Sequence, residues 1–549
     1  MKRIRSFLTR LGVAASAAFG LSVGTSLSAA EFEVCDCAAG AVSGCIAGDD
    51  GNDGAPGRPW RSYERARQAF AGLAAGDAIR FCRGGSWVIG AESGTRWVNN
   101  ACRADNRCTV GSYLPVGMPA NTLRPILQRI NAAHMFALEN GGMAVHEEGY
   151  VLESLDIRGS GGGSNGIFLY NEIDDVRISD FSIRGFGIGV HVAGSNSCAP
   201  GAAACNGENE RIRLLDSHVI GNVHQGWLGG SDGSEIIGNE FDRNGSTAVL
   251  DHNIYLAGDT LDMRVAHNRL RHSALDAQGL CKAVSLVAHG KHQGLVVEYN
   301  WVEEDLGAAG EGCWGIALDH GYGNQAEAFV DVVVRGNTVV NVGNVGIGTS
   351  NCRDCVIENN IVVSQQPFAS AAIAVPSKTP TAEDLPQQAM SIRNNAILID
   401  SDTASSGIRL GTQGDMHSIV SNAIVYLGTH SVFDCLQLNL APASYADIDY
   451  NLCHTPMAAS AEWSAGNGSL SAWQQLTGFD LHSLTLDPAY ALTHGTDLSP
   501  VTANSPMVNA GHPTASSTSD HNGFARDAQP DIGAYEWRSD SLHADGFED

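Results

Sequence analysis

The chain has little positive charge and very few lysines. Its 33 Lys and Arg residues are outnumbered by 60 Asp and Glu residues, and its formal net charge is −27 at pH 7. A surface of this sign repels polyanions, so we expect neither nucleic acid nor an anionic membrane as a partner. Long helical periodicity is also nearly absent, which argues against a helical domain.

Long apolar runs are missing beyond the N-terminus. Lys2, Arg3 and Arg5 precede a mostly apolar run, and Ser28-Ala29-Ala30 then supplies the small residues of a cleavage site. We therefore predict that residues 1–30 are a secretory signal peptide. No later run reaches the roughly 18 apolar residues of a spanning helix, so we expect no membrane insertion. The 14 cysteines, an even number, suit disulfides in an oxidising compartment.

One position recurs at intervals of about 30 residues through the middle of the chain. Asn occupies it in eight consecutive repeats, with an apolar residue three positions before and, in most repeats, another two positions after. The eleven aligned positions are Leu155, Phe181, Ser217, Asn239, Asn268, Asn300, Asn337, Asn360, Asn395, Asn422 and Asn451. This pattern predicts a repeated structural unit.

Stacked turns of a parallel β-helix account for the repeat. Equivalent side chains of successive turns lie about 4.8 Å apart, so each buried Asn can donate to one neighbour and accept from the other. Unequal spacings then reflect loops of different length that leave one core. We predict an all-β, single-stranded parallel β-helix of about eleven rungs over residues 121–455.

The ends of such a solenoid need covering, because its apolar interior would otherwise face water. Ser62 is expected to cap a short helix over Tyr63–Ala75 at the N-terminal end. Residues 31–120 then form an entry and cap, residues 456–537 form C-terminal rungs or a second cap, and residues 538–549 form an acidic tail.

A second strand in each rung aligns on Ile254, Val284 and Ile316 in the centre of the chain. In this register Cys281 and Cys313 both lie three residues before the aligned position of adjacent rungs. Equivalent positions of adjacent rungs are close enough for a disulfide, so we predict that these two cysteines are joined.

Several segments together resemble one known group of proteins. They are Gly51–Gly54 with the following Pro59-Trp60, the Asn ladder, and the closing Asp-Ile-Gly-Ala-Tyr-Glu of residues 531–536. They resemble secreted bacterial right-handed parallel β-helix proteins of the pectin-lyase-like superfamily, over about residues 48–537. The resemblance implies a right-handed coil and a bacterial protein in the extracellular space or periplasm. It selects no activity, because this superfamily includes polysaccharide lyases, glycoside hydrolases, uronate epimerases, phage tailspikes and adhesins.

Titratable side chains gather in three consecutive central rungs. In the aligned register His252 and Lys282 share a column, and Tyr255 lies beside them. Two neighbouring cations favour a neutral base, and Tyr255 can act as the acid, so the leading hypothesis is β-elimination on a uronic-acid polymer by a polysaccharide lyase. The other candidates are Asp251, Asp319 and His320 as catalytic groups and Trp227, His289 and Trp314 as substrate contacts. Glycine and alanine at flanking positions would leave a flat surface for a sugar chain.

Two other functions fit the same scaffold. An inverting glycoside hydrolase would use Asp251 and Asp319, which lie two rungs, or roughly 10 Å, apart. A non-catalytic, adhesin-like solenoid would only bind its ligand. An extracellular polysaccharide is the expected partner in all three cases.

No cofactor is required by the sequence. Glu303, Glu304 and Asp305 offer oxygen ligands of the kind that Ca²⁺ prefers. The closed Cys and His spacing of a structural zinc site is missing. Calcium is therefore the metal to look for in the structure.

Overall fold

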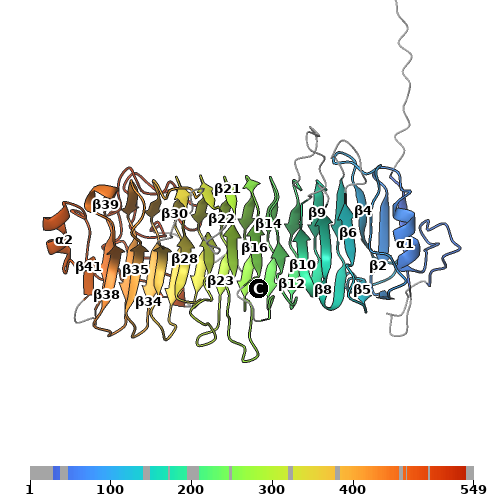
Figure 1. Cartoon of the computed structure of the whole chain (residues 1–549), viewed down its shortest axis with the longest axis horizontal. Helices are drawn as coiled ribbons and strands as arrows, with labels where there is room; N and C mark the ends of the chain where they lie inside the picture. Colours follow the sequence, from blue (N-terminus) through green and yellow to red (C-terminus); the bar gives the residue numbers. More distant parts are fainter. Residues whose placement is uncertain are drawn as a thin grey trace, which may run out of the picture.

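The computed structural model describes residues 29–36, 47–139, 149–170, 173–194, 209–246, 250–318, 326–376, 384–456, 461–464, 466–492 and 495–538. Most of the expected signal peptide and most of the expected acidic tail lie outside these residues. Parallel strands are stacked along one long axis, with α1 near one end and α2 near the other (Figure 1). The predicted all-β parallel β-helix is confirmed.

The first sheet contains 14 parallel strands. They are β1 (Glu31–Val34), β2 (Ala78–Cys82), β4 (Cys108–Tyr113), β7 (Tyr150–Glu153), β9 (Val176–Ser179), β11 (Arg213–Leu215), β14 (Glu235–Ile237), β18 (Arg264–Ala266), β22 (Val296–Glu298), β26 (Val333–Arg335), β30 (Val356–Glu358), β33 (Ser391–Arg393), β36 (His417–Val420) and β39 (Tyr445–Asp449). The eleven predicted rungs correspond to the strands from β7 onwards. Strands β1, β2 and β4 extend the sheet into the segment that we expected to be an entry and cap.

The second sheet follows the first after a sharp turn in each rung. Its strands are β3 (Ser86–Ile89), β5 (Ile126–Arg129), β8 (Asp156–Tyr170), β10 (Ser182–Val192), β12 (His218–Ile220), β15 (Glu240–Asp242), β19 (Arg269–Arg271), β23 (Trp301–Glu303), β27 (Thr338–Val340), β31 (Ile361–Ser364), β34 (Ala396–Ile399), β37 (Ala423–Tyr426) and β40 (Leu452–His454).

The third sheet completes each rung, and the long strands β8 and β10 run through both the second and the third sheet. Its other strands are β6 (Phe136–Glu139), β13 (Trp227–Leu228), β16 (Ile254–Ala257), β20 (Leu286–His289), β24 (Ile316–Leu318), β28 (Val345–Thr349), β32 (Ala371–Val375), β35 (Ser405–Leu410), β38 (Phe433–Leu438) and β41 (Ala461–Ser464). A short fourth sheet contains β17 (Thr260–Leu261), β21 (Lys291–Gln293), β25 (Ala328–Val330) and β29 (Cys352–Arg353).

The Asn ladder lies in the turn between the first and second sheets. Each amide from Asn239 to Asn422 donates from Nδ2 to the Oδ1 of the next ladder Asn over 2.9–3.1 Å. That Oδ1 also accepts the backbone N–H of the preceding ladder residue, and Nδ2 donates to a main-chain carbonyl. All eight amides are at most 2% exposed. Burial of so many amides is tolerated because each is satisfied on both sides. The predicted ladder is confirmed.

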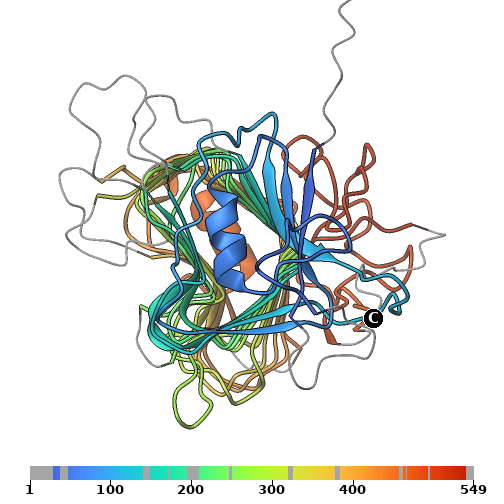
Figure 2. The same cartoon turned by 90° about the vertical axis from the view of Figure 1, so that its right-hand side faces the viewer.

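Both ends of the solenoid are covered by helices. Helix α1 (Tyr63–Phe70) begins at Ser62, whose side chain accepts the N–H of Arg65, as predicted, but it ends before the expected Ala75. It buries Tyr63 and Phe70 against Trp97 and lies across the end of the solenoid (Figure 2). Helix α2 (Leu470–Thr477) lies near the opposite end. Neither helix in the described part of the chain has the length and apolarity needed to cross a membrane.

The C-terminal segment returns along the outside of the solenoid. Leu498 and Ala534 pack on outward side chains of β31, β34 and β37, such as Ile361 and Leu398. Arg526 anchors the segment, because its guanidinium donates to Asn359 Oδ1 at 3.0 Å and to Glu536 Oε2 at 2.9 Å. The segment therefore covers the C-terminal half of the second sheet.

Four disulfides join described cysteines: Cys35–Cys82, Cys102–Cys108, Cys281–Cys313 and Cys435–Cys453. They agree with the oxidising compartment that the cysteine content predicts.

Replacement of a central ladder residue should destabilise the protein strongly. In Asn300→Ala, Asn268 loses the acceptor for both its Nδ2–H and its backbone N–H. Two buried donors without partners cost about 3 kcal/mol of unfolding free energy. Denaturant unfolding of Asn300→Ala and of Asn100→Ala, which removes an exposed amide, measures the effect. Equal midpoints for the two variants would contradict the proposed role of the ladder.

Asp480 terminates the ladder and should give the protein a distinctive pH dependence. Its carboxylate accepts from Asn451 Nδ2 at 3.2 Å and from the indoles of Trp463 and Trp473 at 2.9 Å, yet burial raises its pKa to about 6. Since the folded-state pKa is raised above the ordinary value of 3.8, this group stabilises the fold most below about pH 4. The contribution is lost as the pH rises through about 6.

We therefore expect the stability difference between the wild type and Asp480→Asn to depend on pH. The advantage of the wild type should shrink by about 2 kcal/mol between pH 4 and pH 7, because only the wild type titrates there. Denaturant unfolding across this pH range measures it, and the exposed Asp105→Asn serves as the matched control. A constant difference between wild type and Asp480→Asn would show that Asp480 does not titrate in this range.

Candidate functional site

Among the three central rungs, the register of the third sheet differs from the predicted one in the rung of Val284. Ile254 pairs with Leu286, and Leu286 pairs with Ile316, so Val284 is two residues away from the aligned position. Val284 lies in the turn that precedes β20, where its carbonyl accepts from Ser273 Oγ at 3.1 Å. Val284 and Leu286 are both apolar and two residues apart, so alternation alone did not distinguish them.

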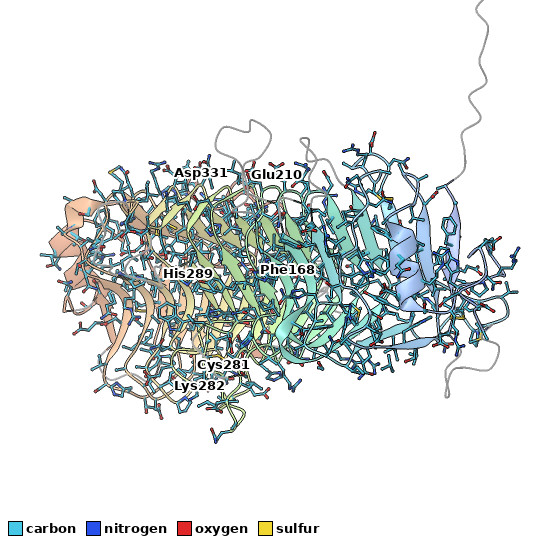
Figure 3. All side chains as sticks on the ribbon, turned by 45° about the vertical axis from the view of Figure 1, so that its right-hand side comes forward. Phe168, Glu210, Cys281, Lys282, His289 and Asp331 are labelled. Carbon is cyan, nitrogen blue, oxygen red and sulfur yellow. A yellow bond between two sulfur atoms is a disulfide. The ribbon has the colours of Figure 1, made fainter. Side chains whose placement is uncertain are left out.

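This shift separates the predicted pair of His252 and Lys282. His252 Nδ1 donates to the carbonyl of Val284 at 2.8 Å, while Lys282 Nζ forms an ion pair with Asp276 Oδ2 at 3.2 Å. In Figure 3, Lys282 lies beside Cys281 and well away from His289. The predicted His252–Lys282 pair is wrong, because the two residues before Leu286 belong to a loop rather than to the strand.

The predicted disulfide between Cys281 and Cys313 is nevertheless confirmed, with a Cα–Cα distance of 5.6 Å. Cys281 pairs with Ala309 through an isolated bridge outside the third sheet. The bond therefore joins two adjacent loops, and the predicted register happened to bring the same residues together.

Four side chains from three successive rungs meet at the third sheet. The ring of Tyr255 lies edge-on to His252, with centroids 5.2 Å apart, and edge-on to His289, with centroids 5.4 Å apart. His289 Nδ1 lies 3.2 Å from Glu327 Oε1. We call His252, Tyr255, His289 and Glu327 the tyrosine cluster.

A short polar stack inside the solenoid positions one side of the cluster. Asn222 donates to Asn244 at 2.9 Å, Asn244 donates to Asn253 at 3.0 Å, and Asn253 donates to Ser285 Oγ at 3.1 Å. Asn253 is fully buried, so it fixes the chain on both sides of itself. His252 is the residue immediately before it, and Ile254 begins β16.

Burial decides the electrostatics of the cluster. Only 3% of His252 is exposed, and this burial, together with the nearby His289, lowers the pKa of His252 to about 4. His252 is therefore neutral at physiological pH. Glu327 is fully buried beside His289. When a histidine donates its Nδ1 proton to a carboxylate, Nε2 remains the basic nitrogen, and the ring is held in one orientation.

The sequence did not reveal Glu327, because it lies 38 residues after His289 and outside the repeated motif. The rung between them ends in a loop, and Glu327 precedes β25 of the fourth sheet. Only the stacking of rungs places this carboxylate behind His289.

The other predicted site residues do not join the tyrosine cluster in the described part of the chain. Asp251 is buried and holds a turn, because it accepts the N–H of Ser246 at 3.1 Å and pairs with His224 at 3.2 Å. Asp319 and His320 lie outside the described residues. Trp227 is fully buried in the core, with its indole donating to the carbonyl of Gly229 at 2.9 Å, so its predicted role in stacking on a sugar is wrong.

Trp314 does lie on the outer face of the third sheet. It packs beside Val345 and Ala374, and its indole donates to Asn344 Oδ1 at 2.6 Å. The small residues that we expected to form a flat outer surface do not all face outward. A Cβ at Gly315 or Gly346 would meet a carbonyl and a core valine at 2.6 Å, so these glycines serve close packing inside.

A second group of aromatic residues lies on the third sheet nearer the N-terminus. Phe168 stacks on His134 with centroids 4.8 Å apart and on Tyr170 with centroids 4.6 Å apart, and His191 lies beside it. Phe168 pairs in register with His191, which is followed by Leu228 and then Tyr255 in the next two strands. The alternation of Phe168 and Tyr170 with buried Ile167 and Leu169 could have revealed this group.

The predicted calcium ligands do not converge. Glu303 pairs with Arg269 at 2.7 Å, and Asp305 pairs with His272 at 3.3 Å. Glu304 is buried, which raises its pKa to about 8, and it lies next to the disulfide of Cys281 and Cys313. Both sulfurs of that group are already bonded to each other, so the described residues contain no assembled metal site there.

The buried histidine of the cluster gives a direct test of this geometry. We expect the imidazole of His252 to titrate near pH 4, well below the ordinary value of 6.5, because burial penalises its charged form. Nuclear magnetic resonance of labelled imidazoles, with assignment by His252→Gln, measures this. A midpoint near 6.5 would mean that His252 is exposed to solvent.

Comparison with protein-family models and with curated proteins found no match. Solved structures of similar shape include a mannuronan C-5 epimerase module from Azotobacter vinelandii, 11% identical, covering 69% of this chain and 95% of that one with a TM-score of 0.42. A GH136 lacto-N-biosidase from Eubacterium ramulus is 11% identical over 83% of this chain and 68% of its own, with a TM-score of 0.41. A pectate lyase is 12% identical over 93% of this chain and 98% of its own, with a TM-score of 0.36.

Likeness at this level says nothing about activity. The fold itself follows from the strand pairings and the ladder of this chain: it is a parallel β-helix.

Proposed function

We propose that the protein is a polysaccharide lyase that cleaves a uronic-acid polymer by β-elimination at the tyrosine cluster. The observation that carries this proposal is the position of Tyr255 between two histidines, one of which is held by the buried carboxylate of Glu327. Elimination needs a base and an acid on the same face of the sugar chain, and this arrangement offers both.

His289 is the better base. The carboxylate of Glu327 beside Nδ1 favours the tautomer in which Nε2 accepts a proton. His252 is less suited, because a base with a pKa near 4 has little affinity for a proton at neutral pH. Its Nδ1 proton is also engaged by the carbonyl of Val284. We assign His252 to positioning the ring of Tyr255.

Tyr255 is the acid. In the proposed step His289 Nε2 takes the proton from the carbon next to the uronate carboxyl group, and a carbon–carbon double bond forms. The bond from the adjacent ring carbon to the glycosidic oxygen breaks, and Tyr255 gives its hydroxyl proton to that oxygen. The products are an unsaturated uronate end and an ordinary hydroxyl end. Water then restores the two protonation states.

Aromatic side chains on the same sheet would hold the polymer. The Phe168 group lies three strands before Tyr255, and Trp314 lies two rungs after it. Successive strands are about 4.8 Å apart, so these rings span several sugar residues along the axis. Stacking on aromatic faces is a common way to bind sugars.

A glycoside hydrolase would need two carboxyl groups at the cleavage point. Near Tyr255 the described carboxylates Asp251 and Glu327 are both buried and already paired. Asp434 and Glu462 do face each other on β38 and β41, and burial together with the charge of Glu462 raises the pKa of Asp434. Asp434 lies six strands and Glu462 seven strands from Tyr255, so this pair marks the alternative site if the activity is hydrolytic.

The proposal predicts unsaturated products from at least one uronate polymer. The full-length protein is incubated with polygalacturonate, alginate and a glucuronan, and absorbance at about 235 nm is followed together with reducing ends. We expect Tyr255→Phe and His289→Asn each to lower kcat by about 100-fold or more, the usual loss for a general acid or base. Glu327→Gln should lower kcat and change the pH–rate profile, because it acts through His289.

A second tyrosine–histidine pair provides matched controls. Tyr299 stacks on His267 with centroids 5.3 Å apart, outside the third sheet. Tyr299→Phe and His267→Asn should leave kcat unchanged. If reducing ends appear without a rise in absorbance, and if Asp434→Asn abolishes their release, the protein is a glycoside hydrolase and not a lyase. Binding without any product would make the protein an adhesin-like binder.

A further inference from the structure

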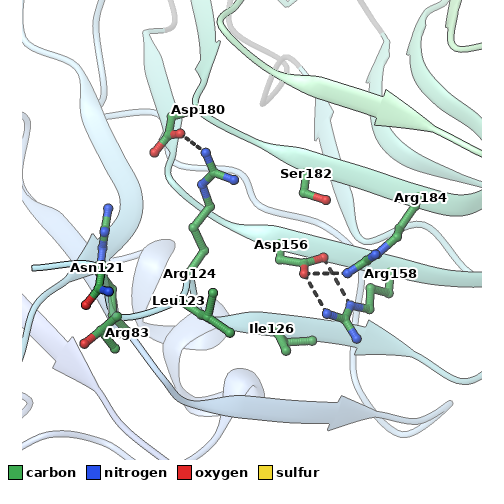
Figure 4. Close-up of a pocket in the computed structure, with 11 residues that line it drawn as sticks. Arg83, Asn121, Leu123, Arg124, Ile126, Asp156, Arg158, Asp180, Ser182 and Arg184 are labelled. Carbon is green, nitrogen blue, oxygen red and sulfur yellow. Dashed lines mark hydrogen bonds and ion pairs between the residues drawn. The ribbon is translucent and has the colours of Figure 1, made fainter. Parts of the chain in front are cut away.

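A hollow on the outer face of the second sheet gathers positive charge in this acidic protein. It has a volume of about 480 Å³ and lies between β5, β8 and β10 and the loop before β5 (Figure 4). Its lining residues are Arg83, Asn121, Thr122, Leu123, Arg124, Ile126, Asp156, Arg158, Asp180, Ser182 and Arg184. This size is within the range of small-ligand sites.

The balance of charge in the hollow is opposite to that of the chain. Four arginines and two aspartates line it, which leaves a local charge of +2, whereas the chain as a whole carries −27. A polypeptide with only 33 basic residues has placed four of them around one cavity. Such focusing attracts an anion locally even when the net field is repulsive.

The two aspartates accept only some of the N–H groups that the four arginines can donate. Asp156 Oδ2 accepts from both Arg158 at 2.7 Å and Arg184 at 2.8 Å, so one carboxylate serves two guanidinium groups. Each guanidinium has five N–H donors. The side chains of Arg158 and Arg184 remain 33% and 47% exposed.

Arg83 and Arg124 form the other side of the hollow. Arg124 pairs with Asp180, which also accepts from Ser154 Oγ at 2.7 Å. The side chain of Arg83 donates to the hydroxyl of Ser112 at 3.3 Å, and no described carboxylate forms an ion pair with it. The charge of Arg83 interacts with that of Asp180 at longer range, so it is offset only in part.

The rung spacing arranges these groups for a linear polymer. Arg158 on β8 pairs in register with Arg184 on β10, so their guanidinium groups follow the solenoid axis at about 4.8 Å. Ser182 and Asn121 add a hydroxyl and an amide, and Leu123 is 74% exposed at the rim. This mixture suits a sugar chain that carries oxyanions, because guanidinium forks bind planar carboxylates and sulfates bidentately.

We propose that this hollow is a non-catalytic binding site for an acidic polysaccharide, whose carboxylate or sulfate groups dock on Arg83, Arg158 and Arg184. The site is separate from the tyrosine cluster, because it lies on the second sheet whereas Tyr255 lies on β16 of the third. The proposal therefore does not depend on the proposed lyase activity. If both hold, the hollow retains substrate while the tyrosine cluster cleaves it.

Chemical footprinting of arginines tests the site in the unmodified protein. The full-length protein is treated with phenylglyoxal in the presence of a galacturonate hexamer, a sulfated galactan oligomer or a neutral galactan oligomer. Modification at each arginine is read by mass spectrometry. We expect the acidic oligomers to protect Arg83 and Arg184 at least about fivefold, since bound oxyanions occupy their donors. Arg353, an exposed arginine on β29, is the internal control and should stay reactive.

Binding of the same oligomers to variants gives the second measurement. Calorimetry in the His289→Asn background avoids cleavage, and there Arg83→Ala/Arg184→Ala should remove one binding site for the acidic oligomer. The single variant Arg83→Ala should weaken that site about tenfold and leave thermal unfolding unchanged.

The more protective oligomer identifies the preferred oxyanion, carboxylate or sulfate. Equal protection of Arg353, equal protection by the neutral oligomer, or no protection of Arg83 and Arg184 at saturation would each overturn the proposal. Absence of lyase products in the previous experiment would not affect it.

Discussion

The buried amides in the turn between the first and second sheets constrain the whole structure. A primary amide inside an apolar core is tolerated only if its donors and acceptor are all satisfied. Here the partner of each amide is the same residue one rung away, from Asn239 to Asn451. The ladder therefore fixes the register between adjacent rungs in two sheets at once. A rung shifted by one residue would leave its own amide and the amides of both neighbouring rungs without hydrogen-bond partners.

The third sheet is less tightly constrained, and the candidate chemistry is found there. Its loops vary in length, so a rung can gain residues without disturbing the ladder. The loop between β19 and β20 illustrates this, because it carries Lys282 away from His252 and brings the carbonyl of Val284 beside that histidine instead. The tyrosine cluster depends on this local register, and its fourth member, Glu327, comes from the segment just before β25 of the fourth sheet.

The two outer faces divide the surface into different chemical regions. The third sheet carries aromatic rings and buried histidines along the axis, whereas the second carries ion pairs and an arginine-lined hollow at its N-terminal half. The returning C-terminal segment covers the other half of the second sheet through Leu498 and Ala534. Positive charge is therefore gathered in one described hollow of the second sheet, and aromatic surface lies on the third sheet.

The sequence by itself determined the fold, the ladder, the N-terminal helix cap and one disulfide. These features depend on patterns that are local or strictly periodic: an Asn with apolar flanks, a capping Ser62, and cysteines in neighbouring repeats. It also pointed to three rungs in which the rings of His252, Tyr255 and His289 do lie together. Only the tertiary structure decided which of these meet, that Trp227 is buried in the core, and that Glu327 and the four arginines of the hollow come together. The reason is that side-chain contacts between rungs depend on loop lengths, and an extra residue in a loop carries no periodic signal.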